Sequence, residues 1–360
     1  MKRISILFLL TLFMSMMGIN AFAQYVENAD GVRIYFNFYK NYYHNDATEV
    51  EVVHPSANGT YEGDVVIPEE VTYLDRIYKV TRIGRQAFYG SSGLTSVTIP
   101  NSVMEICPSA FKGCTSLTSV TIPNSVKYIE EGAFVNCSGL TSVTIPDGQS
   151  YIGTKVFMGC TSLTSVTIPN SVKVIYEGAF SGCTSLTSVI LPNSVKYIDE
   201  GAFQYCTSLT SVTLNNVEYI MFSAFQGCRS LTSVTLPSSV KEIGTYAFYG
   251  SKLSTIVSLI EDPFPIVGKG RLWSTFSDDT FSDATLYVPV GSVEKYKTKN
   301  GWKDFSHIVP LDEGMSVKVM ENDNNSPSNY YLLNGQQVDQ PQKGLTIVKT
   351  GKKAVKVLVK

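Results

Sequence analysis

The sequence holds few of the residues and motifs on which enzymes and nucleic-acid-binding proteins depend. Its three histidines are His44, His54 and His307, and no two of them stand at the spacing of a metal site on a helix. It contains neither a Gly-x-Ser-x-Gly elbow nor a glycine-rich phosphate loop. Charged residues make up only 17% of the chain and the formal net charge is −2, so no basic face for nucleic acid is expected. We therefore expect no catalytic residue, no cofactor, no bound metal and no nucleic-acid partner.

Long hydrophobic runs are also scarce. The exception is the N-terminal stretch from Ile4 to Met17, which follows Lys2 and Arg3 and precedes the small residues of Ala21-Phe22-Ala23. This arrangement predicts a secretory signal peptide over residues 1–23, because the apolar stretch is short for a bilayer span and a cleavage site follows it. An uncleaved anchor helix is the alternative. No later segment has the length and apolar character of a membrane span, so an exported protein is expected.

What the sequence has in abundance is one unit, repeated about eight times. Leucines recur every 23 and later every 22 residues, at Leu94, Leu117, Leu140, Leu163, Leu186, Leu209, Leu231 and Leu253. Phenylalanines keep the same step, at Phe88, Phe111, Phe134, Phe157, Phe180, Phe203, Phe225 and Phe248. A fixed period in this range predicts a solenoid of the α+β or mainly β class, in which each repeat forms one rung.

The pattern inside one copy predicts its local structure. Ser119 to Ile122 alternates polar and β-branched residues, so we expect a short strand with Val120 and Ile122 inward. Pro123 ends the strand because proline has no N–H for the ladder. Glu131 to Phe134 suggests one turn of α- or 3₁₀-helix that places the phenyl ring in the interior. A single rung leaves both faces of its apolar layer open, so rungs must stack to be stable.

Most of the seven cysteines occupy one repeat position. These six are Cys114, Cys137, Cys160, Cys183, Cys206 and Cys228. In an exported protein the usual expectation is disulfides, but the parallel Cβ vectors of a stacked column fit a bridge poorly. The column therefore predicts buried free thiols with weak hydrogen bonds to the backbone, and a line of thiols offers no tetrahedral set for zinc. Cys107 lies off the column and is the one candidate for a reactive thiol.

The repeated string L-T-S-V-T-I-P-N-S-V-K-x-I-x-x-G-A-F-x-x-C resembles the BspA-type leucine-rich repeat of bacterial surface proteins, from roughly Val65 to Leu311. The resemblance implies a leucine-rich-repeat stack of about eight rungs of 22–23 residues, with one short parallel strand per rung and a cap at each end. It also implies a secreted or cell-surface protein without enzymatic activity, an adhesin-like module that contacts host or matrix proteins through its repeat face.

Two other functions stay open. A carbohydrate-binding surface protein could capture glycans on the aromatic residues near the N-terminus, which are Tyr25, Tyr35, Phe36, Phe38, Tyr39, Tyr42 and Tyr43. A purely structural envelope component would need no ligand.

The end of the chain has a pattern of its own. An Asn-Gly turn at Asn334-Gly335 and two alternating segments, residues 344–349 and 353–360, predict a small basic β-structure. It resembles the C-terminal tail domains that Bacteroidetes use for export and surface attachment, which implies the outer-membrane secretion machinery as a partner and attachment at the outer membrane. An inert terminal hairpin is the alternative. Ahead of it, Glu321 to Pro327 predicts a polar linker; calcium binding there stays open, although the spacing is not that of an EF hand.

The expected organisation is therefore a signal peptide (1–23), an N-terminal β cap (24–63), the leucine-rich-repeat solenoid (64–256), a C-terminal cap (257–314), a linker (315–329) and a C-terminal β tail for sorting or attachment (330–360).

Two sets of outward positions are the candidates for binding a partner. The strands carry parallel hydroxyl ladders formed by Ser96, Thr98, Ser119, Thr121, Ser142, Thr144, Ser165, Thr167, Ser211, Thr213, Ser233 and Thr235, which Ile190 interrupts. A second column consists of Tyr128, Tyr151, Tyr197 and Tyr219, beside Lys127, Lys173, Lys196 and Lys241. A solenoid face can serve as a platform for an extended ligand, and tyrosine is favoured in binding patches. The alternatives are that Ser and Thr are soluble strand formers, that the tyrosines stack from rung to rung, or that the hydroxyl array orders water as in ice binding.

Overall fold

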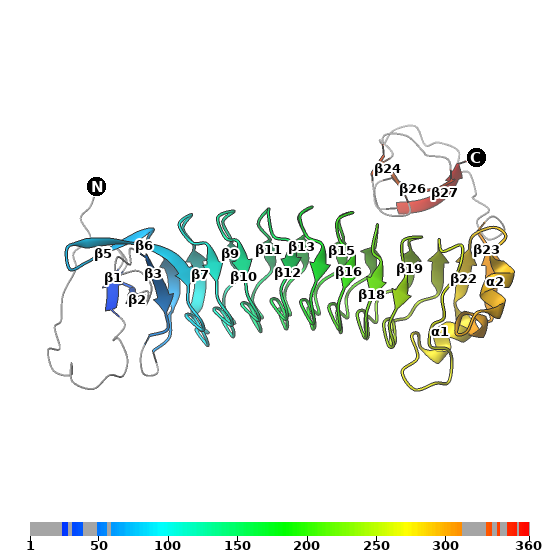
Figure 1. The fold of residues 1–360 in the computed structure, drawn as a ribbon, viewed down its shortest axis with the longest axis horizontal. Helices are drawn as coiled ribbons and strands as arrows, with labels where there is room; N and C mark the ends of the chain where they lie inside the picture. Colours follow the sequence, from blue (N-terminus) through cyan, green and yellow to red (C-terminus); the bar gives the residue numbers. More distant parts are fainter. Residues whose placement is uncertain are drawn as a thin grey trace. The chain divides into compact units, whose positions relative to one another are not determined.

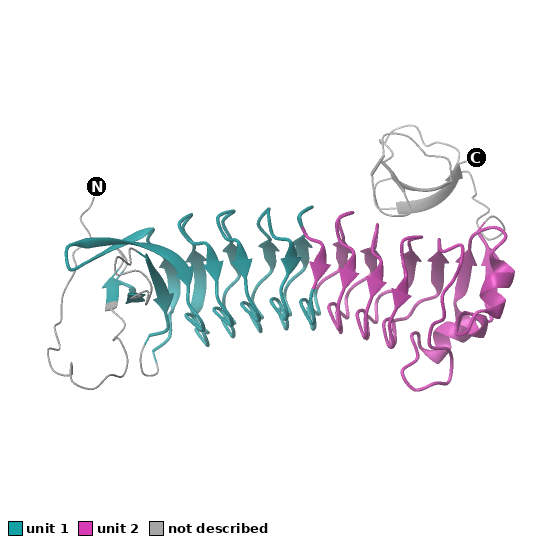
Figure 2. Ribbon diagram, in the orientation of Figure 1, with its two compact units in different colours: residues 1–171, 176–185 teal, residues 172–175, 186–360 magenta. Residues whose placement is uncertain are grey.

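The computed structural model describes residues 24–27, 31–38, 49–55 and 59–311, and the strands at 329–332, 337–338, 344–350 and 353–359. The predicted signal peptide, the turn at Asn334-Gly335, and Tyr39, Tyr42 and Tyr43 lie outside these residues, as does nearly all of the predicted linker. The chain divides into two compact units, residues 1–171 with 176–185 and residues 172–175 with 186–360 (Figure 2).

The first unit begins with an antiparallel sheet. Its strands are β1 (Gln24–Glu27), β2 (Arg33–Phe38) and β3 (Glu49–Val53), and a hairpin of β5 (Glu70–Tyr73) and β6 (Arg76–Ile83) follows. β3 pairs with β6 in parallel, so the N-terminal strands continue into the sheet of the repeats.

The repeats of the first unit contribute longer and shorter strands, and both kinds form parallel ladders (Figure 1). The longer strands are β4 (Gly63–Val66), β7 (Leu94–Thr98), β9 (Ser119–Thr121), β11 (Ser142–Thr144) and β13 (Ser165–Thr167). The shorter strands are β8 (Glu105–Ile106), β10 (Tyr128–Ile129) and β12 (Tyr151–Ile152). Equivalent residues pair in register, as Ser142 does with Ser119 and with Ser165.

The second unit repeats this construction and contains the described helices. Its longer strands are β15 (Ser188–Ile190), β17 (Ser211–Thr213), β19 (Ser233–Leu236) and β21 (Thr255–Ser258), and its shorter strands are β14 (Val174–Ile175), β16 (Tyr197–Ile198), β18 (Tyr219–Ile220) and β20 (Glu242–Ile243). β21 is followed in parallel by β22 (Thr285–Val288) and β23 (His307–Pro310), with α1 (Asp278–Asp283), α2 (Val293–Thr298) and the 3₁₀ turn Trp302–Asp304 between them.

The C-terminal strands form a separate antiparallel sheet. They are β24 (Asn329–Leu332), β25 (Gln337–Val338), β26 (Gly344–Thr350) and β27 (Lys353–Val359). β26 pairs with β27 over its whole length, which confirms the predicted β-pair.

Stacked phenyl rings form the centre of the core. Phe134 is fully buried, and its ring centroid lies 5.1 Å from that of Phe111 and 5.6 Å from that of Phe157, with interplanar angles of 0° and 11°. In the second unit, Phe225 stacks at 5.3 Å on both Phe203 and Phe248. The eight repeat leucines are buried as well. The inward positions read from the period are therefore confirmed, and both units are built as β-solenoid with parallel strands.

The turn that carries each phenylalanine corrects one expectation, because it is a series of turns and not a helix. The amides of Ala133 and Val135 donate to carbonyls three residues earlier, at 3.2 and 3.1 Å. Those of Gly132 and Phe134 donate instead to the next rung, each at 2.9 Å. Since every second amide bonds to the neighbouring rung, no run of local bonds can build a helix.

The backbone of this turn enters the left-handed region just before the Ala-Phe pair. Gly132 has φ 62° there, and Ser109 holds the same conformation with φ 56°. Such angles strain every residue with a Cβ, and glycine adopts them freely. Three copies place a glycine here, Gly132, Gly178 and Gly201, whereas five copies place a residue with a Cβ, so the left-handed turn is kept whichever residue occupies it.

The cysteine column lies in the core beside the phenyl stack. All seven cysteines are buried and free. The Cys137 thiol donates to the carbonyl of Phe111 at 3.1 Å, the Cys160 thiol to that of Phe134 at 3.2 Å, and Ser251 keeps the bond with its hydroxyl at 3.2 Å. Burial raises the pKa of Cys160 to about 12, so the thiol stays protonated and donates. The prediction of buried, backbone-bonded thiols is confirmed.

Within the described ranges, no helix combines the length and the apolar character that crossing a membrane requires.

Candidate interaction surface

The hydroxyl ladder of the first unit is exposed over three successive strands. Its members are Ser119, Thr121, Ser142, Thr144, Ser165 and Thr167, and all six are exposed. Between them, Val120 and Val143 are only 5% and 4% exposed, and Val166 of β13 is half-buried, so alternate residues face solvent and core. Among the described residues, none of these hydroxyls makes a side-chain hydrogen bond, which leaves every donor and acceptor free for water or a partner.

The neighbouring threonine position behaves differently. Thr141 Oγ1 donates to the carbonyl of Thr118 at 3.2 Å, and Thr164 Oγ1 donates to that of Thr141 at 3.2 Å. These hydroxyls join one rung to the next, so they belong to the framework. The ladder hydroxyls one and three residues further along the chain are therefore distinct, because they make no bond of this kind between rungs.

The N-terminal end of the ladder is already bonded within the chain. Asp64 Oδ1 accepts from Ser96 Oγ at 2.6 Å and from Thr95 Oγ1 at 2.7 Å. These bonds, that of Ser96 first, lower the pKa of Asp64. Ser96 is half-buried and Thr98 exposed, so this first pair offers one free hydroxyl where the later pairs offer two.

The ladder in the second unit is less uniform. Ser211 and Ser233 are exposed, while Thr213 and Thr235 are half-buried beside a cleft of about 150 Å³ that Asn215 also lines. Ile190 is 64% exposed at the position that threonine holds in the other strands, so an apolar side chain interrupts the hydroxyl ladder there. The most regular hydroxyl platform is thus the one on β9, β11 and β13.

The tyrosine column is largely engaged between rungs. Tyr128 is 52% exposed, but Tyr151, Tyr197 and Tyr219 are half-buried. The rings of Tyr197 and Tyr219 lie 5.6 Å apart, and burial raises the pKa of Tyr197. Rung-to-rung stacking accounts for these contacts without a partner, and only Tyr128 projects as a free anchor would.

One copy of the repeat has Glu218 in place of the lysine, and this carboxylate forms ion pairs with the lysines of the two neighbouring copies. Glu218 lies 3.4 Å from Lys196 Nζ and 2.6 Å from Lys241 Nζ. Its hydrogen bond with Lys241 is the main cause of the lowered pKa of Glu218. A single carboxylate between two ammonium groups stabilises their stacking, so this part of the column is an ion network between rungs.

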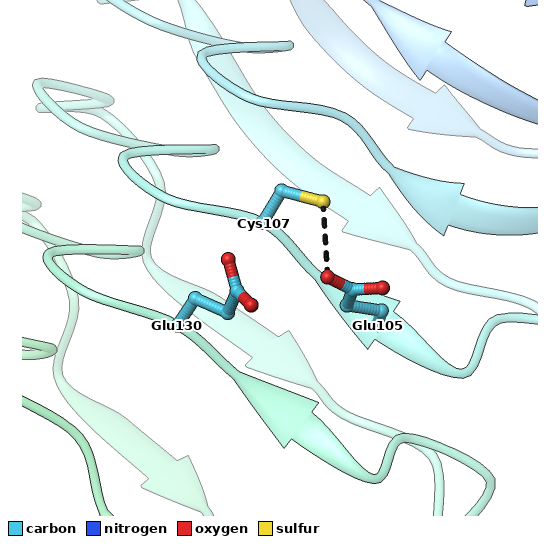
Figure 3. Close-up of side chains that lie close together, drawn as sticks. All are labelled: Glu105, Cys107 and Glu130. Carbon is cyan, nitrogen blue, oxygen red and sulfur yellow. Dashed lines mark hydrogen bonds between the residues drawn. The ribbon is translucent and has the colours of Figure 1, made fainter.

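A second cluster lies in the first unit where β8 meets the next rung. Donor atoms of Glu105, Cys107 and Glu130 lie within 4.8 Å of one another, and the three side chains converge in Figure 3. The Cys107 thiol donates to Glu105 Oε1 at 3.6 Å. Burial, and next the charge of Glu105, raises the pKa of Glu130.

Two carboxylates and a sulfur are a donor set that zinc could use, but Arg82 stands where the cation would. Its Nη2 lies 3.0 Å from Glu105 Oε1 and 3.4 Å from Cys107 Sγ. A divalent cation would have to displace this guanidinium and also take the proton from the thiol. The geometry therefore fits an internal ion-pair network centred on Arg82 better than a metal site.

The same cluster overturns the expectation that Cys107 is a reactive thiol. Cys107 is 3% exposed, and burial raises its pKa to about 11, although Arg82 acts in the opposite direction. A nucleophilic cysteine needs an accessible thiolate, which this residue lacks at neutral pH.

This network was not expected from the sequence. Its signal lies in the register, because β8 pairs with β10 so that Glu105 stands beside Tyr128, and Arg82 pairs with Glu105 in the preceding rung. Glu105 stands where other copies have a tyrosine, and Arg82 lies beside it one rung earlier. This combination could have indicated the contact.

The architecture is that of a leucine-rich-repeat solenoid, and comparison with known families agrees. The profile of the BspA type leucine rich repeat region matches residues 69–158 and 129–255, with six copies. The chain belongs to this family.

Solved structures of leucine-rich-repeat proteins are similar in part. A leucine rich cell surface protein from Faecalibacterium prausnitzii is 23% identical, with 81% of this chain and 96% of the other covered and a TM-score of 0.44. A leucine-rich repeat protein from Bacteroides ovatus is 23% identical, with coverages of 77% and 87% and a TM-score of 0.39. A leucine-rich repeat protein from T. pallidum is 28% identical, with coverages of 64% and 88% and a TM-score of 0.37. No protein of curated function matches the sequence.

Proposed function

We propose that this chain is an exported, surface-associated binding protein whose strand face contacts a host or matrix protein. The observation that carries the proposal is the ladder on β9, β11 and β13, where six exposed hydroxyls stand in register and make no side-chain hydrogen bond within the described part of the chain. Membership of the BspA type family supports a repeat-based binding role.

The chemistry of this face suits weak contacts repeated many times. Serine and threonine lose little rotamer entropy when they are immobilised, so each contact costs little to form. Since neighbouring rungs present the same pair of hydroxyls, an extended partner can engage several rungs at once, and simultaneous contacts multiply the affinity. Nothing in the ladder requires catalysis, and the function we propose is binding without turnover.

Export and attachment are further parts of the proposal. The predicted signal peptide over residues 1–23 supports secretion, and the basic β tail over residues 330–360 supports an encounter with the outer-membrane secretion machinery. The six-part organisation given above, with a cap at each end of the solenoid, is proposed with them.

The glycan alternative has weaker support in the described aromatic residues. Phe36 is fully buried, and the ring of Tyr35 lies 5.7 Å from that of Tyr25 and 6.5 Å from that of Tyr61. Phe38 contacts Tyr73 at 4.5 Å. Rings that pack on one another leave less free face for a sugar than an open platform would. The structural envelope component has no observation of its own in its favour.

The experiment is a binding screen of the full chain against matrix proteins and glycans on one array. A variant carries lysine at Ser119, Thr121, Ser142 and Thr144. The matched control carries four lysines at exposed hydroxyl positions off the ladder, namely Thr115, Ser116, Ser150 and Thr161. Both variants add the same charge, so a difference between them reports the position of the contact.

The proposal predicts a protein signal that the ladder variant loses and the control keeps. A signal from glycans alone, unchanged in both variants, would favour the carbohydrate-binding alternative. The absence of any signal would favour the structural component and contradict the proposal.

A further inference from the structure

One cleft in the second unit is lined by charges of both signs. Its volume is about 580 Å³, within the range of roughly 300–1,000 Å³ typical of small-ligand sites. Arg229 and Lys252 supply the cations, and Asp279 and Asp283 the carboxylates. All four side chains are exposed. In the part of the chain that the structure describes, none of the four forms an ion pair or a side-chain hydrogen bond.

The cations depart from the repeat at one position. The residue after the cysteine column is a small hydroxyl residue in the earlier copies, namely Ser92, Thr115, Ser138, Thr161, Thr184 and Thr207. Arg229 replaces it in the copy after these, and the next copy, which has one residue fewer between Ser251 and Leu253, has Lys252 there. Since Phe225, Cys228 and Leu231 keep their buried positions in the copy that carries Arg229, the stacking of the rungs does not account for the arginine.

The carboxylates also go against local preference. Asp279 and Asp283 are four residues apart on α1, where side chains share a face and like charges repel. Asp283 is the last residue of the helix, whose C-terminal end carries partial negative charge and disfavours an acid, and no basic residue lies in its last turn. Asp279 lies in the first turn of α1, where the helix dipole favours an acid, so Asp283 is the carboxylate that weakens the helix. An unfavourable acid that lines a cleft is typical of a functional site.

The composition of the lining selects the ligand. Asp279 and Asp283 oppose a plain anion such as phosphate, while Arg229 and Lys252 oppose a divalent cation. No aromatic ring lines the cleft, so the stacking surface that neutral sugars use is missing from it. The hydroxyls of Ser251 and Ser254 in the lining already donate to the carbonyls of Phe225 and Thr232, and that of Ser277 accepts from the amide of Gly250. The four charged side chains are therefore the groups that select the ligand.

We infer that this cleft binds a short peptide segment whose side chains carry one positive and one negative charge, with the carboxylate toward Arg229 and Lys252 and the cationic group toward Asp279 and Asp283. This site is separate from the hydroxyl ladder on β9, β11 and β13, and the inference stands whether or not that ladder binds a matrix protein.

The test is titration calorimetry on the full chain with end-blocked tetrapeptides. The dipolar probes are acetyl-Lys-Gly-Gly-Glu-amide and its reverse, and the neutral reference is acetyl-Gln-Gly-Gly-Gln-amide. Blocked ends ensure that only the side chains carry charge. The protein variants are Arg229→Gln and Asp283→Asn, with Lys127→Gln and Asp147→Asn as controls that remove the same charges from exposed positions elsewhere.

At least one dipolar peptide is expected to bind about tenfold more tightly than the neutral one at low salt, and the preference should shrink as salt is added. Either cleft variant should abolish this preference, while both controls keep it. Unchanged thermal unfolding curves would show that the variants are folded. Equal or absent binding of dipolar and neutral peptides would overturn the inference, and so would an equal loss in the controls.

Discussion

The stacked phenyl column allows one stability prediction to be worked through from the structure. Replacing Phe134 by alanine removes a fully buried ring that stacks on both faces, 5.1 Å from Phe111 and 5.6 Å from Phe157. Large-to-small changes of this kind cost about 3–5 kcal/mol. Each aromatic pair adds about 0.5–1.5 kcal/mol beyond burial, and Phe134 takes part in two, so the loss should lie near the upper end of that range. The matched control is Tyr128→Ala in the same rung, where the ring is 52% exposed.

The assay combines urea unfolding followed by circular dichroism with hydrogen exchange of the rung amides. Phe134→Ala should lower the unfolding midpoint and accelerate exchange first at the amides around residue 134, because rungs contact only their neighbours. Tyr128→Ala should change stability by less than about 1 kcal/mol, as is usual for surface positions. A similar loss in both variants, or a loss below about 1 kcal/mol for Phe134→Ala, would refute the claim that the phenyl stack holds the rungs together.

Three further predictions concern thiols, pH and backbone strain. A thiol reagent should label none of the seven cysteines in the native protein, since all are buried and free. It should label all seven after denaturation without a reducing agent, and fewer labelled thiols would reveal disulfides. Because the folded pKa of Glu130 is raised, the folded state holds its proton more tightly than the unfolded state, and stability falls as pH rises through the pKa. Glu130→Gln should therefore raise the melting temperature at pH 7 and lose this advantage below pH 4.5, the ordinary pKa of a glutamate. A variant equally stabilised at both pH values would contradict the assignment. Gly132→Ala should cost about 1–2 kcal/mol, because alanine is strained at φ 62°, and a neutral effect in urea unfolding would disprove the strain argument.

Periodicity explains why so much of the rung was predictable. The segment Ser119 to Ile122 was expected as a strand and forms β9 over Ser119–Thr121, because the alternation of polar and β-branched residues recurs in every copy. Cysteines at one repeat position could be read as stacked thiols because stacking preserves their side-chain direction. Such conclusions follow from the repeat itself, without any long-range contact having to be guessed.

Contacts that depend on departures from the repeat were harder to predict. The turn around Phe134 was expected as helix, because local sequence does not show that alternate amides bond to the next rung. Cys107 was considered the one candidate for a reactive thiol, because its place off the column does not show that Arg82 and Glu105 contact it. The charged cleft was missed since α1 lies in a segment without a period, and only the fold brings Asp283 to Arg229.

The central claim is that the ladder on β9 and β11 is where a protein partner touches this chain. The most direct measurement is photo-crosslinking of the full chain to the matrix protein found in the array, with a photoreactive residue placed either at Ser142 or at Tyr128. Both positions are exposed in the first unit, one on the ladder and one on the shorter strand β10. The account predicts a crosslink from Ser142 and none from Tyr128. A crosslink from Tyr128 alone would contradict it and move the contact to the tyrosine column.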